Sequence, residues 1–487
     1  MNFNVSKLRF TPVELSIVLS AISALATILA FNYGLKFGVL AGILLIGLPA
    51  AIGIIIYPKF GVIVMLVVAY LIMGVSRFGI DFPLGTVMDG ILLLLIFGFF
   101  LSQKIMPNWG IFNNPTTFLI LVWICYNLMQ FFNTTAESQL AWVYTIRSVA
   151  AVMLSYFIFM KHIRSLSFIK LLFKIWMFLA FLGALYTLKQ EFFGFSQFEK
   201  DWLATDAEGY YRLYFIAGRW RKFSFFTDPV SLSYNMVMGA IFCIVLLLNP
   251  ARLYKKVILC VLIIVFMIAM VYSGTRAAFP LVPIALFLLA ILKMNYKVLI
   301  AVGIGLLIFI GLIFAPIYTP NMMRFQSAFR PGNDPSYNLR QDNQKYIQPF
   351  IKSHPFGGGL GSVGMWGARF SPNSYLSSFQ PDSGYVRVAV ELGWVGLFII
   401  CSLFFVSLMS GINNYYAIKD PELKNYCLAM ILIVFSLAVG NYPQEAIVQF
   451  PTSVYFYLFL ALLHITLQLD KEKQILSVKN GDELSPR

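Results

Sequence analysis

Val257–Val271 reads VILCVLIIVFMIAMV, and Val298–Phe314 reads VLIAVGIGLLIFIGLIF. Neither stretch holds a charged residue, and both approach the roughly 20 apolar residues that an α-helix needs to cross a bilayer. Similar runs recur along the chain, separated by segments that hold the charges and prolines. Of the 487 residues, 59% are hydrophobic and 12% are charged, which leaves too few polar side chains to cover a soluble core of this size. The sequence therefore predicts an all-α polytopic membrane protein.

Apolar runs of helical length occur about fourteen times, so we expect about 12–14 transmembrane helices. They lie near residues 14–31, 38–56, 60–76, 86–102, 116–132, 142–160, 167–187, 229–248, 256–273, 277–292, 298–315, 384–409, 425–440 and 449–468. Lys7 and Arg9 precede a full-length apolar run, which predicts a retained first span rather than a cleaved signal peptide.

The basic residues of the short loops indicate the orientation of the chain. With the N-terminus inside, every inner connection is basic, and these connections hold Lys59, Lys104, Lys161, Arg164, Arg252, Lys255, Lys256, Lys293, Lys297, Lys419 and Lys424. The short outer loops hold little positive charge, and Arg77 is offset there by Asp81. Because Lys and Arg concentrate in cytoplasmic loops, we expect both termini in the cytoplasm. This distribution accounts for most of the net charge of +15, so no nucleic-acid partner is expected.

The cysteines and histidines favour neither a disulfide framework nor a metal site. All five cysteines fall inside predicted spans, at Cys125, Cys243, Cys260, Cys401 and Cys427. No CxxC motif occurs in the sequence, and the chain holds 3 histidines. Cysteines in such places behave as small hydrophobic residues, and we expect no metal and no other cofactor.

The predicted spans leave two long outer loops. The chain divides into transmembrane segment 1–187, outer loop 188–228, transmembrane segment 229–315, outer loop 316–383, transmembrane segment 384–468 and cytoplasmic tail 469–487. The second loop is far longer than two helices need, and loops of this length are usually functional or disordered. It is rich in arginine and aromatic residues, which predicts a partly helical fold over the membrane surface. Its arginines fit two interpretations, a solvated cover or a site for an anion such as phosphate.

Several motifs lie at this outer face. Asn338–Gln348 predicts a short helix with Arg340, Gln344 and Ile347 on one face. The segment that follows, His354–Gly364, is rich in glycine, which permits tight turns or a close approach of the backbone to a ligand.

The end of the first loop alternates cations with aromatic residues. In Gly218–Pro229, Arg219 and Arg221 stand among Trp and Phe side chains, a pattern that fits either interfacial anchoring or anion binding. Ser273–Arg276 forms the turn of a tight helical hairpin, and an arginine beside two apolar helices must be solvated or paired. Arg387 and Glu391 have i,i+4 spacing and can neutralise each other on one helix face.

Four of these motifs, which follow one another along residues 210–400, resemble those of the O-antigen ligase and polymerase superfamily. Ser273–Ala278 resembles its Ser-x-Ser/Thr-Arg-Gly/Ala signature, and His354–Gly359 its His-Pro-x-x-Gly-x-Gly segment. Asp382–Tyr385, followed by Glu391–Gly396, is similar to its His/Asp-Asn/Ser-x-Tyr/Leu and Glu-x-Gly-x-x-Gly motifs. Arg219 or Arg221 with Asp228–Pro229 looks like its Arg-x-x-Gly-x-Phe-x-x-Pro stretch, with the glycine replaced.

The resemblance implies glycosyl transfer at the outer leaflet of a bacterial cytoplasmic (inner) membrane. The donor would be a glycan on undecaprenyl diphosphate. The acceptor would be another lipid-linked glycan for a polymerase, or lipid A core for a ligase. Nucleotide and metal would not be required, and a polymerase leaves room for a chain-length regulator protein as a partner.

The residues of this chain supply groups for that chemistry. Arg219, Arg221, Arg276 and Arg340 are candidates to bind the diphosphate, since the leaving group gathers negative charge. Asp382 and His354 are candidates for the general base, with Arg340 as a third catalytic residue.

Ligases of the superfamily typically carry His where Asp382 stands, which favours a polymerase. Asp382 as a helix N-cap and His354 as a structural residue stay open alternatives. A flippase or transporter of the same precursors is a further alternative, although charges within the spans are few and no internal repeat is evident. The last alternative is a scaffold protein without catalytic activity.

Overall fold

The computed structural model describes residues 47–78, 85–216, 218–250, 252–329, 335–445 and 447–479, and single residues between 20 and 31. The predicted span near 14–31 lies outside these ranges apart from those single residues, and the span near 38–56 is described from Gly47 on. Arg330 and the last part of the predicted tail also lie outside the described residues.

Within the described chain, 11 helical segments are long and apolar enough to cross a membrane. They comprise α3 (Pro58–Val75) with η2 (Ser76–Phe78), α4 (Gly85–Ile105), α5 (Pro115–Met129) with η4 (Gln130–Phe132), α6 (Gln139–Val149) and α7 (Leu154–His162) joined through η5 (Ala151–Met153), α8 (Leu166–Phe192), α11 (Pro229–Leu247), α12 (Leu253–Ser273), α14 (Tyr296–Phe314), α19 (Gly393–Ala417), α20 (Pro421–Gly440) and α21 (Thr452–Lys479). Shorter apolar helices occupy Gly47–Ile56 and Arg276–Leu292, the latter formed by η6 (Arg276–Ala278) and α13 (Leu281–Leu292). The all-α polytopic prediction is confirmed.

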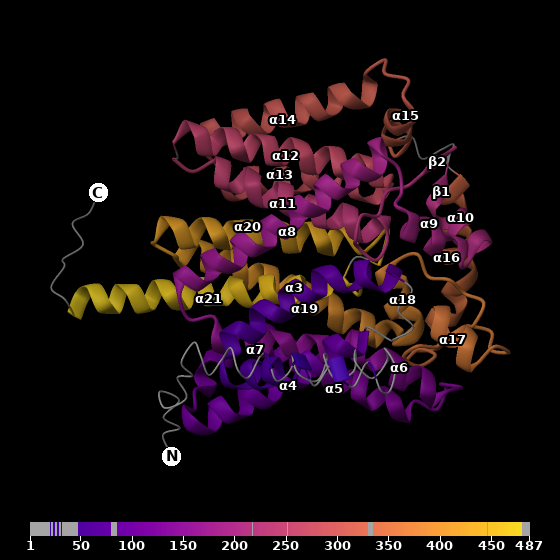
Figure 1. Cartoon of the computed structure of the whole chain (residues 1–487), viewed down its shortest axis with the longest axis horizontal. Helices are drawn as coiled ribbons and strands as arrows, with labels where there is room; N and C mark the ends of the chain where they lie inside the picture. Colours follow the sequence, from indigo (N-terminus) through magenta and orange to yellow (C-terminus); the bar gives the residue numbers. More distant parts are fainter. Residues whose placement is uncertain are drawn as a thin grey trace.

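The spanning helices run side by side, and the elements of the long loops gather at one end of them (Figure 1). We call this end, on the right of Figure 1, the loop face, and the other end the opposite face. The centre of the bundle is formed by α11, α20 and α21, whose most apolar windows are 78%, 67% and 83% buried. By contrast α14 is 11% buried, as expected for a helix that faces lipid. The loop face therefore lies at one end of these well-packed central helices.

The two long loops are partly helical, as the sequence predicts for the second. The first holds α9 (Gln197–Ala204), α10 (Ala207–Tyr214) and the antiparallel strands β1 (Phe215–Ile216) and β2 (Arg219–Trp220). The second holds α15 (Pro320–Ser327), α16 (Pro335–Ser353) and α17 (Gly364–Phe370). Helix α16 is longer than predicted, because it continues past Pro349.

Two other boundaries differ from the prediction. The apolar run near 384–409 is divided into α18 (Gly384–Glu391) and α19, because Gly393 adopts a φ of +69° that interrupts the helix. At the other end of the chain, α21 continues to Lys479, so the described part of the predicted tail is helical rather than a separate segment.

Candidate active site

The segment before α11 is fixed by a buried cation from another helix. Arg77 is 3% exposed, and its guanidinium donates to the carbonyl oxygens of Ser224, Phe226 and Thr227. The same group lies 4.2 Å from the ring centroid of Phe223, an arrangement that favours cation–π attraction. Arg77 is therefore a structural residue of the loop face. Sequence reasoning placed it in a short outer loop opposite Asp81 and missed this role.

The aromatic residues of the first loop form a small core. Leu203, Tyr214 and Phe223 are buried together, with Trp202 and Trp220 packed against them. These rings therefore pack inside the loop rather than anchoring the segment at the membrane interface. This core holds β2 and the chain after it against the ends of α8 and α12.

Ser224 occupies the place of the replaced glycine in the Arg-x-x-Gly-x-Phe-x-x-Pro stretch, counted from Arg221 to Pro229. Its φ is +53°, in the left-handed region that favours glycine. Its N–H donates to Oε1 of Gln190 (2.8 Å) and its hydroxyl to the carbonyl of Gly183 (2.9 Å). These bonds stabilise the left-handed conformation of Ser224.

Two arginines from distant segments hold the turn between α12 and η6. The Nε–H of Arg221 donates to the carbonyl oxygen of Ser273 (2.9 Å), and one Nη donates to the hydroxyl of Thr275 (2.8 Å). From α15, the Nε–H of Arg324 donates to the carbonyl of Gly274 (2.7 Å). Gly274 has a φ of +62°, and a Cβ there would lie 2.9 Å from Nε of Arg324. The turn that carries Arg276 is therefore flanked by two further cations.

We call Arg221, Arg276 and Arg324 the arginine cluster. Burial lowers the pKa of Arg221, while Asp228 and Tyr214 raise it and Arg276 and Arg340 lower it again. Positive charge is thus concentrated around Arg221, and an anion bound there would reduce the repulsion between the cations. Arg324 was visible in the sequence only as one of several basic loop residues, because its partner Gly274 lies in another segment.

Arg219 does not belong to this cluster. Its Nη1 lies 3.1 Å from Oε1 of Glu191, and Lys222 Nζ lies 3.2 Å from the other oxygen of the same carboxylate. Glu191 and Arg219 stand at an otherwise largely apolar groove of about 770 Å³, walled by α12, α13, α14 and α15. Arg219 thus marks the polar edge of a lipid-facing groove.

Arg340 and Asp382 meet in a cavity of about 310 Å³ with both polar and apolar walls. Nε of Arg340 lies 3.5 Å from Oδ2 of Asp382. The cavity is also lined by Gln341, Asn343, Gln344, Gln380, Ser383 and Tyr442. The side chain that caps α18 is that of Ser383, which accepts from the N–H of Val386. The carboxylate of Asp382 faces Arg340 rather than serving as the N-cap.

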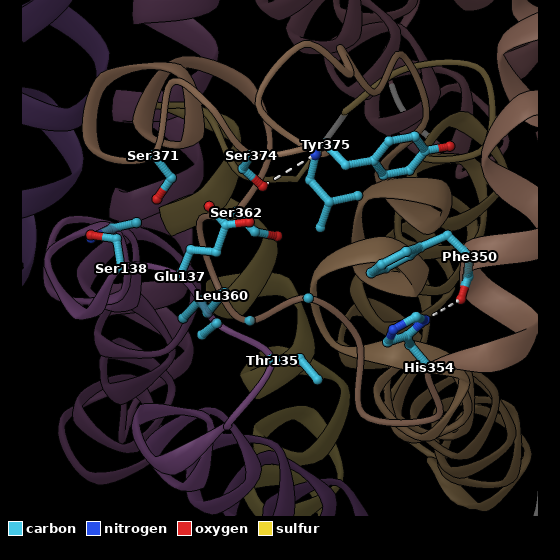
Figure 2. A pocket seen from close by; sticks show the side chains of 15 residues that line it. Thr135, Glu137, Ser138, Phe350, His354, Leu360, Ser362, Ser371, Ser374 and Tyr375 are labelled. Carbon is cyan, nitrogen blue, oxygen red and sulfur yellow. Dashed lines mark hydrogen bonds between the residues drawn. The ribbon is translucent and has the colours of Figure 1, made fainter.

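His354 lines a different cavity from Arg340 and Asp382. This cavity has a volume of about 100 Å³ and includes Thr135 and Glu137 in its wall (Figure 2). The imidazole stacks on Phe350 with ring centroids 4.1 Å apart, and its Nδ1 lies 2.8 Å from Oγ of Ser353 and 3.0 Å from the carbonyl oxygen of Phe350. The structure does not bring His354 and Asp382 together in one cavity.

The glycine-rich segment binds protein backbone. The N–H groups of Gly358 and Gly359 donate to the carbonyl oxygens of Val390 and Glu391, at 2.8 and 2.9 Å. A Cβ at Gly393 would lie 2.0 Å from the carbonyl oxygen of Pro355, so the two segments touch through their main chains. The motif therefore joins the long loop to the break between α18 and α19.

The predicted pair of Arg387 and Glu391 is present, with Nε 3.2 Å from Oε1. Glu445, from the segment after α20, adds a second carboxylate 2.8 Å from Nη1 of Arg387. Arg387 thus bridges two carboxylates and ties α18 to the neighbouring loop.

The turn at Arg276, the loop with α15 and α16, the glycine-rich segment and α18 all fall within one continuous stretch. Residues 259–401 match the family model for O-antigen ligase. The match includes Arg276, Arg324, Arg340, His354 and Asp382, whereas Arg221 lies before it. No curated protein matches the chain.

Over residues 259–401 the match confirms the resemblance that the motifs show to the O-antigen ligase and polymerase superfamily. It does not separate a polymerase from a ligase. Among the described residues, no group of three or more His, Cys, Asp or Glu is arranged to hold a metal ion.

Proposed function

We propose that the protein is a glycosyltransferase of the polymerase type. It joins oligosaccharide repeat units carried on undecaprenyl diphosphate, at the outer face of the bacterial cytoplasmic membrane. The loop face lies outside and both termini lie in the cytoplasm. The observation that carries the proposal is the set of arginines at the loop face: Arg221 and Arg324 hold the turn that carries Arg276, and Arg340 lies 3.5 Å from Asp382.

The arginine cluster is suited to the diphosphate of the donor. Arg221 and Arg324 are oriented by main-chain carbonyls, so their positions are set before the ligand arrives. Cations that are fixed in advance stabilise the charge that develops on a leaving diphosphate without further reorganisation. Guanidinium groups also match phosphate oxygens in geometry. We assign Arg276 and Arg340 to diphosphate binding as well, with Arg219 at the edge of the site.

The apolar groove beside Arg219 offers a place for the polyprenyl chain. Its walls are α12, α13, α14 and α15, and α15 also carries Arg324. A lipid whose chain lies in this groove would present its diphosphate near the arginine cluster. The site therefore offers a groove for the polyprenyl chain of the donor and cations for its diphosphate.

The reaction assigned to the site is a direct displacement. The hydroxyl oxygen of the acceptor sugar forms a bond to the anomeric carbon of the donor, while the bond from that carbon to the diphosphate oxygen breaks. Undecaprenyl diphosphate leaves with the electron pair, and Asp382 takes the hydroxyl proton. Arg340 holds this carboxylate in place. The amide side chains of Gln341, Asn343 and Gln344 in the same cavity offer donors and acceptors for sugar hydroxyls.

A ligase is the second candidate, favoured by the name of the matching family. The two differ in acceptor, so the test supplies both. Purified protein receives undecaprenyl-diphosphate-linked repeat units, alone or with lipid A core, and the products are separated by size. We expect a ladder of longer lipid-linked glycans in the first sample. Transfer only to lipid A core would establish the ligase, and no transfer to either acceptor would contradict the enzyme proposal.

A further inference from the structure

A second large groove lies on the opposite face, away from the arginine cluster. It has a volume of about 1090 Å³ and is bordered by the end of helix Gly47–Ile56, the start of α3 and the ends of α4 and α7. Ile56, Leu101 and Ile105 contribute apolar walls, and Ile105 is 75% exposed. The described residues thus leave an open apolar surface between four helices.

The polar edge of this groove is cationic. Lys59, Lys161 and Arg164 line it together with one carboxylate, that of Glu472. The nearest nitrogen of Arg164 lies 3.8 Å from Oε1 of Glu472, which is too long for a hydrogen bond. Three cations therefore face a single loosely placed anion.

Lys161 is 9% exposed, and its ammonium is held by neutral groups. Its Nζ donates to Oε1 of Gln103 (2.9 Å) and to the carbonyl of Met106 (2.7 Å). An ammonium has three N–H donors, and these two acceptors orient it without neutralising its charge. Such a group favours an anion nearby.

His162 follows Lys161 at the end of α7. The side chain is 9% exposed and lines the groove. Its Nε2 makes no hydrogen bond to any residue that the structure describes. Because this nitrogen is buried, it is not available to a ligand in the groove, and the positive charge at the groove is that of Lys59, Lys161 and Arg164.

We propose that this groove binds one anionic phospholipid. Its phosphate lies among Lys59, Lys161 and Arg164, and its acyl chains follow the apolar walls. Basic pockets between transmembrane helices on the cytoplasmic side are suited to such headgroups. The lipid would connect the helix that ends at Ile56 with α3, α4 and α7, and so stabilise a part of the bundle remote from the active site.

Native mass spectrometry of the full chain tests the proposal. The protein is released from nanodiscs made of equimolar phosphatidylglycerol and phosphatidylcholine, and the retained lipids are counted. We expect one phosphatidylglycerol in preference to phosphatidylcholine. A basic residue near a membrane contributes about five-fold to the binding of an anionic lipid, so Lys59→Gln with Arg164→Gln should lower the preference about thirty-fold.

The matched control is Lys297→Gln, which removes an exposed charge at the start of α14, outside the groove. It should retain the native preference. Equal retention of the two lipids by the native protein, or the same loss in the control, overturns the proposal.

A photo-crosslinking residue at Ile105 keeps the test informative if the double variant fails to fold. A crosslink to phosphatidylglycerol supports the proposal. A crosslink to residues 1–46 would mean that the chain itself fills the groove, and overturns it. Inorganic phosphate added to nanodiscs of phosphatidylcholine alone should give no thermal stabilisation. Stabilisation equal to that by phosphatidylglycerol would assign the site to a free anion instead.

Discussion

Replacing Asp382 by asparagine separates the chemistry of this side chain from its part in folding. Its carboxylate lies 3.5 Å from Nε of Arg340, and the two side chains are 46% and 34% exposed. Because both partners are solvated, the pair contributes about 0–1 kcal/mol to stability. Asparagine has nearly the same shape as aspartate and fits the same space. The unfolding temperature of Asp382→Asn should therefore change little.

Turnover should respond far more strongly than stability. Asparagine cannot take the proton of the attacking hydroxyl, and a general base contributes about 10²–10⁴-fold to the rate. The assay measures the undecaprenyl diphosphate released from lipid-linked repeat units by the purified protein. Asp342→Asn is the matched control, since Asp342 lies on the helix of Arg340, pairs loosely with Lys345 at 3.9 Å and is 73% exposed. This control should keep the native rate.

The reasoning is refuted if folded Asp382→Asn loses less than about ten-fold in turnover, because a general base contributes more than that. A large fall in thermal stability would also contradict it, since a solvated ion pair cannot account for such a fall. Equal losses in Asp382→Asn and the Asp342→Asn control would point to charge near the loop face in general rather than to Asp382.

The remaining predictions concern the anion site, the second base candidate and the glycine joint. Arg276→Ala and Arg340→Ala should each lower turnover by about 10²–10³-fold or more while the protein stays folded, and normal glycan chains from both variants would contradict the anion site. His354→Gln should retain most activity, because His354 lines another cavity; a loss as large as that of Asp382→Asn would make His354 the base instead. Gly393→Ala should destabilise the protein by about 2 kcal/mol or more, since φ is +69° and the new Cβ would lie 2.0 Å from a carbonyl oxygen. Gly90→Ala, which meets nothing within 4 Å, should be neutral or stabilising by up to about 1 kcal/mol, and thermal unfolding of the two variants compares them.

The spanning helices could be predicted because their signal is local. The length and the apolar character of a run such as Val298–Phe314 can be read without reference to any other segment. The break before α19 could not be read in this way, since Gly384–Glu391 continues the same apolar pattern. The helix ends there because Gly393 and Pro355 meet through their main chains, and that contact depends on the tertiary fold.

The active-site candidates were predicted one by one rather than as a site. Arg221 and Arg276 stood out in separate motifs, but their convergence with Arg324 depends on how three loops meet at Gly274. Arg77 was read as an ordinary loop charge because the carbonyl oxygens that it binds lie far along the chain. Asp382 and His354 were both candidates for the general base, and motif order could not show that they line separate cavities.

The account depends most on the claim that the protein elongates lipid-linked glycans with its own residues at the loop face. The most direct measurement incubates the purified protein with undecaprenyl-diphosphate-linked repeat units, with and without a chelator, and resolves the lipid-linked products by size. We predict a ladder of longer glycans, one undecaprenyl diphosphate released at each step, and the same ladder with the chelator. Unextended substrate that instead changes leaflet in liposomes would contradict the account and identify a transporter.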